Sequence, residues 1–244
     1  MTSREAMLQQ LKNLKGKPLK EKVVHIATYF WAPIAAVLFT AVVIVSLIVT
    51  NANRKDPVLS FYCLNSMAVQ NPVQEYLDEF ATDHGVDLEK YAVQLLSNGN
   101  TYGTESTVSY ANAEVFAAMV TARELDLTTS GIPILLQLAY NENFWDLTQL
   151  LTPEQLENNK DNFLYIDMAF VEAMKELSIM EDIPPYPDPT KPEDMEQPVP
   201  FALKLPEDAE FTKLSYPHMQ AGIAVVVTAP HEELALDFLE QLMK

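Results

Sequence analysis

Two short polar stretches carry the residues best suited to hold a ligand. The stretch TTSG at 128–131 lies between an apolar run and a helix-like run, and NS at 65–66 follows another apolar run. Hydroxyl groups and the free N–H groups of a helix start can bind a sugar hydroxyl or an anion. The alternative is that Thr129 or Ser130 caps the helix, and we expect a cap first. The candidate ligand contacts here are Asn65, Ser66, Thr128, Thr129 and Ser130.

Aromatic side chains offer a second way to recognise a sugar, by stacking on its ring. Tyr102 and Tyr110 flank a polar loop and are free to reach a ligand or a partner, so they complete the set of candidate contacts. Tyr140 and Trp145 can stack as well. Trp145 lies within a stretch whose pattern is typical of core packing, and we expect it in the core.

The remaining reactive side chains form no catalytic or metal-binding pattern. The four histidines fall at no metal-ligand spacing, and Cys63 belongs to an apolar strand where a buried, inert thiol is the usual case. Acidic residues are so abundant that any two can be drawn as a pair. The sequence has no glycine-rich phosphate loop and no serine elbow. We therefore expect no enzyme, no cofactor and no metal.

The elements that must position these residues alternate along the chain. Helical stripes, with capping residues at several of their ends, separate short apolar runs. This order predicts an α/β fold with a mostly parallel sheet and helices on both faces. The expected strands are 58–64, 91–96, 125–128 and 221–228, and the expected helices start near 71, 109–112, 133, 167 and 230.

A change of composition marks residues 181–200. This stretch of 20 residues has seven prolines and six acidic residues. Proline removes a backbone donor, so the stretch cannot be helix, and a central strand is excluded. We expect an extended loop or linker.

An apolar segment near the N-terminus predicts a membrane anchor. Residues 29–49 contain no charge over 21 residues, which is long enough to cross a bilayer. A cleaved signal peptide is the alternative, but its apolar region is usually shorter. The expected organisation is a cytoplasmic tail at 1–22, a single transmembrane helix at 23–50, a stalk at 51–57 and an extracytoplasmic domain at 58–244.

Charge supports this orientation and limits the partners. Residues 1–22 hold six basic and two acidic side chains, whereas the residues after the apolar segment hold 10 basic and 32 acidic ones. Basic residues favour the cytoplasmic side. The acidic outer domain argues against nucleic acid as a partner. A single cysteine excludes an intramolecular disulfide, so the core alone must hold this domain.

Two stretches resemble extracellular solute-binding proteins of the type 2 periplasmic-binding fold, which serve ATP-driven importers. The first is AMVTARELDLTTSGIPILLQLAYNENFWDLTQLLTPEQL, with Leu125-Asp126-Leu127 and an aromatic–x–Asp–Leu phrase at 144–147. The second is the closing AGIAVVVTAPHEELALDFLEQLM. The resemblance covers most of 58–180 and 199–244. Full members have two lobes around a ligand cleft, whereas this outer domain has room for one, and 181–200 lies where the second lobe would begin.

The resemblance implies a membrane-anchored binding or interaction module in a reduced, one-lobe form. It would sense a solute or support a membrane complex. One alternative is a structural partner subunit that has lost the ligand site, whose sign would be an exposed apolar patch. Another is a hydrolase acting on envelope material. The expected partners are the lipid bilayer, a sugar or other small solute, and a membrane protein.

Overall fold

The computed structural model of the chain divides into two compact units, residues Met1–Arg54 and Lys55–Lys244. The boundary between the units falls within the predicted stalk at 51–57. The structure describes Gly16 and residues 18–29, 31–66, 70–97, 110–176 and 184–243.

The first unit holds the apolar segment. Helix α2 (Leu19–Tyr29) precedes helix α3 (Trp31–Ala52), which has 22 residues. The most apolar 18 residues of α3 have a mean hydropathy of 2.7, and none of them is buried. At 1.5 Å per residue such a helix is about 33 Å long, close to the thickness of a bilayer core. Among the described residues, α3 alone is long and apolar enough to cross a membrane. It is consistent with a membrane anchor or a signal sequence.

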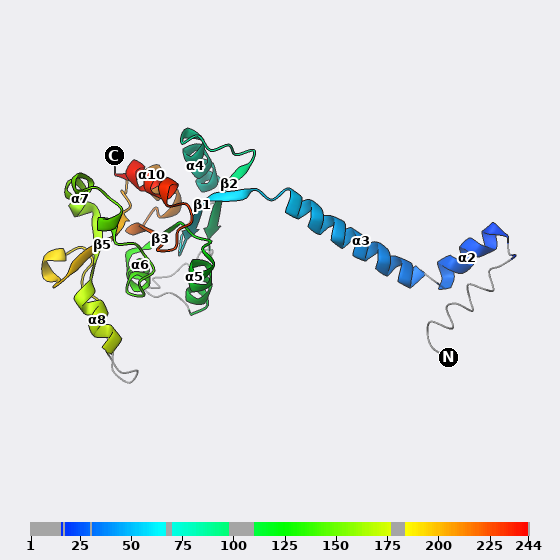
Figure 1. Cartoon of the computed structure of the whole chain (residues 1–244), viewed down its shortest axis with the longest axis horizontal. Helices are drawn as coiled ribbons and strands as arrows, with labels where there is room; N and C mark the ends of the chain where they lie inside the picture. Colours follow the sequence, from blue (N-terminus) through cyan, green and yellow to red (C-terminus); the bar gives the residue numbers. More distant parts are fainter. Residues whose placement is uncertain are drawn as a thin grey trace. The chain divides into compact units, whose positions relative to one another are not determined.

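The second unit is an α/β domain built on one six-stranded sheet (Figure 1). Its strands lie in the order β2-β1-β3-β6-β5-β4. The strands are β1 (Asp56–Cys63), β2 (Tyr91–Ser97), β3 (Leu127–Gly131), β4 (Phe163–Asp167), β5 (Pro198–Lys204) and β6 (Ala221–Val225). The helices are α4 (Gln70–Asp83), α5 (Tyr110–Ala122), α6 (Ile132–Ala139), α7 (Pro153–Asn159), α8 (Met168–Glu176), α9 (Glu210–Ser215) and α10 (Glu232–Leu242), with 3-10 turns at Leu147–Gln149, Lys160–Asn162 and Pro192–Asp194.

The sheet is mixed, and the prediction of a mostly parallel sheet is wrong. Strand β1 pairs in parallel with β2 and β3, but β3–β6, β6–β5 and β5–β4 are antiparallel pairs. Helical crossovers through α4 and α5 return the chain to run parallel in the first half. The strands of the second half join through connections that reverse direction, and two of them, β4 and β5, were not predicted.

Two core layers cover the two faces of the sheet. On one face α4, α9 and α10 pack on β1, β3 and β6, through residues such as Phe80, Phe211 and Phe238. On the other face α5, α6 and α8 pack through residues such as Phe116 and Leu135. Figure 1 shows α4 and α10 on one side of the strands and α5 and α6 on the other. Alternating side chains of each strand feed the two layers.

The stretch at 181–200 contributes to the sheet, which corrects its prediction as loop alone. Strand β5 begins at Pro198, includes Pro200 and lies between β6 and β4. Both prolines pair only on the β4 side, because β6 pairs only with Leu203 and Lys204. Neither proline has an N–H group to donate, but no hydrogen bond to β6 is lost by this. The interior strand β5 can therefore contain both prolines.

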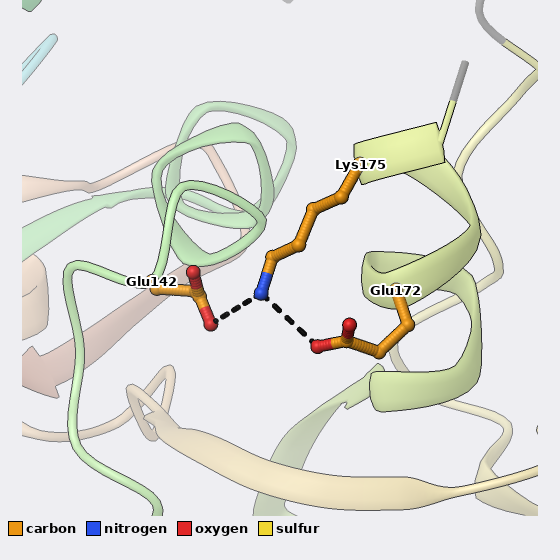
Figure 2. A network of polar contacts seen from close by, with 3 residues as sticks. All are labelled: Glu142, Glu172 and Lys175. Carbon is orange, nitrogen blue, oxygen red and sulfur yellow. Dashed lines mark hydrogen bonds and ion pairs between the residues drawn. The ribbon is translucent and has the colours of Figure 1, made fainter.

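An exposed ion-pair network links helix α8 to the segment after α6. Figure 2 shows the ammonium of Lys175 between Glu172 on the same helix and Glu142 after α6, at 3.0 and 3.1 Å. Their carboxylates raise the pKa of Lys175 above its ordinary value.

At the start of α8, the Asp167 carboxylate accepts hydrogen bonds from the backbone N–H groups of Ala169, Glu196 and Gln197.

Candidate functional site

The carboxyl ends of β1 and β3 form the natural place for a ligand. The chain runs from β1 to β2 on one side and comes back to β3 on the other, so a topological switch point lies between β1 and β3. Open α/β sheets bind ligands outside such points. The connection between β5 and β6, residues 205–220, crosses this end of the sheet. We call these strand ends and their connection the 205–220 end.

The switch point is filled by a side chain of the protein itself. The Tyr216 hydroxyl donates a hydrogen bond to the carbonyl oxygen of Leu64 at 3.0 Å and lies 3.0 Å from the Thr129 hydroxyl. The Thr129 hydroxyl also lies 3.3 Å from the sulfur of Cys63. Thr129 and Cys63 are wholly buried, and Tyr216 is 2% exposed. Thr129 therefore holds the 205–220 connection to the sheet and does not face solvent.

The acidic groups of this buried cluster are not poised to react. Burial raises the pKa of Cys63 to about 11, although the Thr129 hydroxyl opposes the shift. Burial likewise raises the pKa of Tyr216 well above its ordinary value. Both groups stay protonated at neutral pH, so neither is an activated nucleophile. The expectation of a buried Cys63 is confirmed.

The first predicted elbow is a turn tied to the same connection. Asn65 has a φ of 49°, in the left-handed region that asparagine tolerates better than most residues. Ser66 is 2% exposed, and its hydroxyl donates to the carbonyl oxygen of Ser215 at 3.0 Å. The elbow thus anchors the end of α9.

The second predicted elbow is part of a strand, and the prediction that it caps α6 is wrong. Strand β3 continues through Gly131, which occupies the N-cap position, and no side chain makes a capping bond there. The N–H of Ile132 instead donates to the carbonyl of Gln220 at 3.3 Å. Thr128 and Ser130 are fully buried, two positions apart on the same face of β3. Backbone pairing with β6 thus takes the place of a cap.

The aromatic candidates have separate outcomes. Tyr102 lies outside the described residues, and Tyr110 begins α5 with a side chain that is not described. Trp145 packs against the buried core, as predicted. Tyr140 stacks on Tyr186 with ring centroids 4.5 Å apart, so a stretch neighbouring β4 covers its ring.

Two hollows open at the 205–220 end, beside the predicted residues. The first has a volume of about 530 Å³. Its polar lining comes from residues distant in sequence: Asn162, Thr190, Lys204, Glu207 and Gln220. Its apolar lining is Ile132, Leu203, Leu205, Pro206, Ala221 and Leu242. None of these residues was predicted as a ligand contact, because their segments come together only through the strand order β6-β5-β4.

The second hollow adjoins the first. It has a volume of about 380 Å³ and shares Glu207 and Gln220 with the first. Its other lining residues come from α9 and the turn after it: Thr212, Lys213, Tyr216, Pro217, His218 and Met219. The Tyr216 that fills the switch point thus also borders this space.

The opposite end of the sheet holds a buried carboxylate with every bond satisfied. Asp126 is wholly buried and accepts from the backbone N–H of Ser60 at 2.8 Å and of His231 at 2.7 Å. The Nδ1 atom of His231 lies 3.1 Å from the same carboxylate. We call this the Asp126 end; it joins β1 and β3 to the start of α10.

The first hollow at the 205–220 end has a mixed lining. Amide, hydroxyl, ammonium and carboxylate groups line it together with apolar side chains, a combination that can orient a small polar molecule. Within the described residues, no group of three metal-binding side chains lies close enough to hold an ion. Comparisons with protein-family models, curated proteins and solved structures found no match for this chain.

Proposed function

We propose that this protein is a membrane-anchored binding module that takes a small polar solute in the first hollow. The observation that carries the proposal is the hollow of about 530 Å³ beside the connection from β5 to β6, next to the end of β3. Ligand pockets for small molecules span roughly 300–1,000 Å³ and combine apolar walls with a few polar groups. Its five polar side chains suit a sugar or another small solute.

The resemblance to solute-binding proteins supports the same function. The two stretches that carry it border the first hollow, through Ile132 in one and Ala221 in the other. The proposal therefore places the ligand beside the predicted elbows. The predicted contacts Ser66 and Thr129 support the floor of the site by fixing the 205–220 connection.

The proposed location is the membrane, with the N-terminus in the cytoplasm and the α/β domain outside. The support is the length and apolar character of α3, together with the excess of basic residues before it. Extraction of membranes with carbonate tests this. An anchored chain stays with the bilayer, and external protease removes residues 55–244 from intact cells. Release of a shorter chain into the medium would establish a cleaved signal sequence.

The structural-subunit alternative has less support. Its expected sign is a contiguous exposed apolar patch. In the described part of residues 55–244, the exposed large apolar side chains belong to four different segments: Tyr91, Val115, Met219 and Val227.

Thermal unfolding of the full chain in detergent micelles tests the binding function. The panel comprises sugars, oligosaccharides, amino acids and short peptides. A ligand that binds only the native state adds about 2.7 kcal/mol at a hundredfold excess over its dissociation constant. We expect a saturable rise of the midpoint that Lys204→Met weakens, whereas Lys160→Met, at an ion-paired lysine outside the hollow, leaves it unchanged. A midpoint that no compound moves would refute solute binding for that panel.

A further inference from the structure

The lysines of the acidic domain differ in whether a carboxylate balances their charge. Four of them form ion pairs with nearby carboxylates: Lys90, Lys160, Lys175 and Lys191. Three form no ion pair within the described part of the chain, namely Lys55, Lys204 and Lys213, although the sequence beyond the apolar segment has 32 acidic residues. Lys204 and Lys213 line the hollows, one each, whereas Lys55 lines neither. Uncommitted positive charge is therefore present at the candidate site.

The second hollow combines this charge with one further donor. Lys213 and His218 both line it. The hydroxyl oxygen of Thr212 has no hydrogen-bond partner among the described residues, but it is shielded from solvent and is not a contact for a solute. An ammonium and an imidazole together suit an anionic oxygen group.

The first hollow has one comparable group. The ammonium of Lys204 donates to the backbone carbonyl of Asp161 at 2.8 Å, which leaves its charge uncompensated. Glu207 is the acidic side chain that lines both hollows. A solute in the first hollow can therefore extend past Glu207 and place its anionic group beside Lys213.

We propose that the solute carries a carboxylate, which binds in the second hollow to Lys213 and His218. This rests on the proposed solute-binding function and names the chemical class of the solute. The strongly acidic domain repels anions at long range, so a local positive charge such as that of Lys213 is needed to hold one. Because Lys213 is exposed, added salt must weaken the attraction.

The test compares acids with neutral analogues on the full chain in detergent micelles. Titration calorimetry measures the dissociation constants of galacturonate against galactose, and of alanyl-alanine against its C-terminal amide. The two pairs separate a sugar acid from a peptide as the source of the carboxylate. We expect one acid to bind about tenfold more tightly than its neutral partner, since charge-assisted hydrogen bonds are the stronger kind. Raising the salt concentration should reduce that difference.

Lys213→Met, which keeps the aliphatic stem and removes the charge, should abolish the difference. Lys191→Met is the matched control, an exposed lysine paired with Asp188 that lines neither hollow, and should retain it. Equal affinity for acid and neutral forms would overturn the carboxylate assignment and leave the binding function standing. A preference for the acid that survives Lys213→Met would overturn the assignment in the same way. Absence of binding by all four compounds and by the wider panel would overturn both proposals.

Discussion

The two ends of one sheet treat polar side chains in opposite ways. At the Asp126 end, a single buried carboxylate joins β1, β3 and the start of α10 through bonds of 2.7–3.1 Å. At the 205–220 end, the buried hydroxyls of Thr212 and Ser215 lack partners among the described residues, and two hollows open. Saturated polar groups stabilise a fold, whereas polar groups that line open space can receive a ligand.

This difference indicates a division of labour within the domain. Substitutions at the Asp126 end should reduce stability and leave the affinity of the native protein for a solute unchanged. Substitutions at the 205–220 end should cost less stability and act on binding. Each of the following changes tests one part of that comparison.

The largest effect is expected for Asp126→Ala. Removing the carboxylate leaves the N–H groups of Ser60 and His231 without their acceptor, and each unsatisfied buried donor costs about 1–3 kcal/mol. We expect a loss of about 3–5 kcal/mol and a fall of roughly 10 °C in the unfolding midpoint. Asp83→Ala, at an exposed aspartate in α4, is the control. A midpoint within about 2 °C of the parent protein would show that this end is not the main polar support.

The next effect contrasts two glycines on neighbouring strands. A Cβ at Gly222 would lie 2.8 Å from Leu164 Cδ1, 2.9 Å from Leu135 Cδ2 and 3.3 Å from the carbonyl of Leu203. Overpacking of this kind costs about 1–3 kcal/mol. At Gly131 the nearest contact is the end of the Met219 side chain at 3.2 Å, and Met219 is 38% exposed and can move. Chemical denaturation should therefore rank Gly222→Ala as clearly more destabilising than Gly131→Ala.

The Asp126 end could be predicted from the sequence better than the 205–220 end. The Asp126 end consists of continuous stretches with strong local patterns. Its strands and α10 were therefore predicted, and Ala235, Phe238 and Leu239 of α10 lie in the core. The capping box of Thr152 and Gln155 at the start of α7 is likewise a feature of local spacing.

The 205–220 end is assembled from pieces that no local pattern connects. Strand β4 was not predicted, although it is as long as β3 and β6, and β5 was not predicted because it contains two prolines. The polar residues around the first hollow meet only because those strands join the sheet beside β6. The hydroxyls at 128–130 were correctly placed at this end of β3. Their role as a helix cap was wrong, because strand pairing continued through Gly131.

A smaller effect is expected for Tyr216→Phe at the 205–220 end. The change removes the hydroxyl that contacts Leu64 and Thr129 and keeps the ring, so the loss should be about 1–2 kcal/mol. Amide hydrogen exchange should become faster in 205–220 while the exchange of β1 is little changed. Tyr165→Phe is the control, because that hydroxyl bonds at an exposed site. Uniform acceleration across the whole domain would mean that Tyr216 supports the core as a unit.

Asp167 provides a pH-dependent test at the start of α8. Burial alone would raise its pKa, but the N–H groups of Glu196, Gln197 and Ala169 outweigh burial and hold the pKa below its ordinary value. A depressed folded-state pKa contributes stability that is complete above the unfolded value of about 3.9 and is lost as pH falls through the folded value. Asp167→Asn should thus destabilise the protein at pH 6, and the difference from the parent should shrink below about pH 4. Glu193→Gln, an exposed change of equal charge, should show no comparable convergence.

The smallest effect is expected for the network in Figure 2, where Lys175 bridges Glu142 and Glu172. Its lysine side chain is 48% exposed, so solvent and salt screen both pairs, and holding three long side chains costs conformational entropy. Lys175→Met should shift the midpoint by no more than about 2 °C, in line with exposed positions generally. The double variant that adds Glu142→Gln should have an unfolding midpoint no lower than that of Lys175→Met alone. A larger shift that disappears at high salt would show that this exposed network supports α8, and that surface charge contributes to stability alongside the buried carboxylate of the Asp126 end.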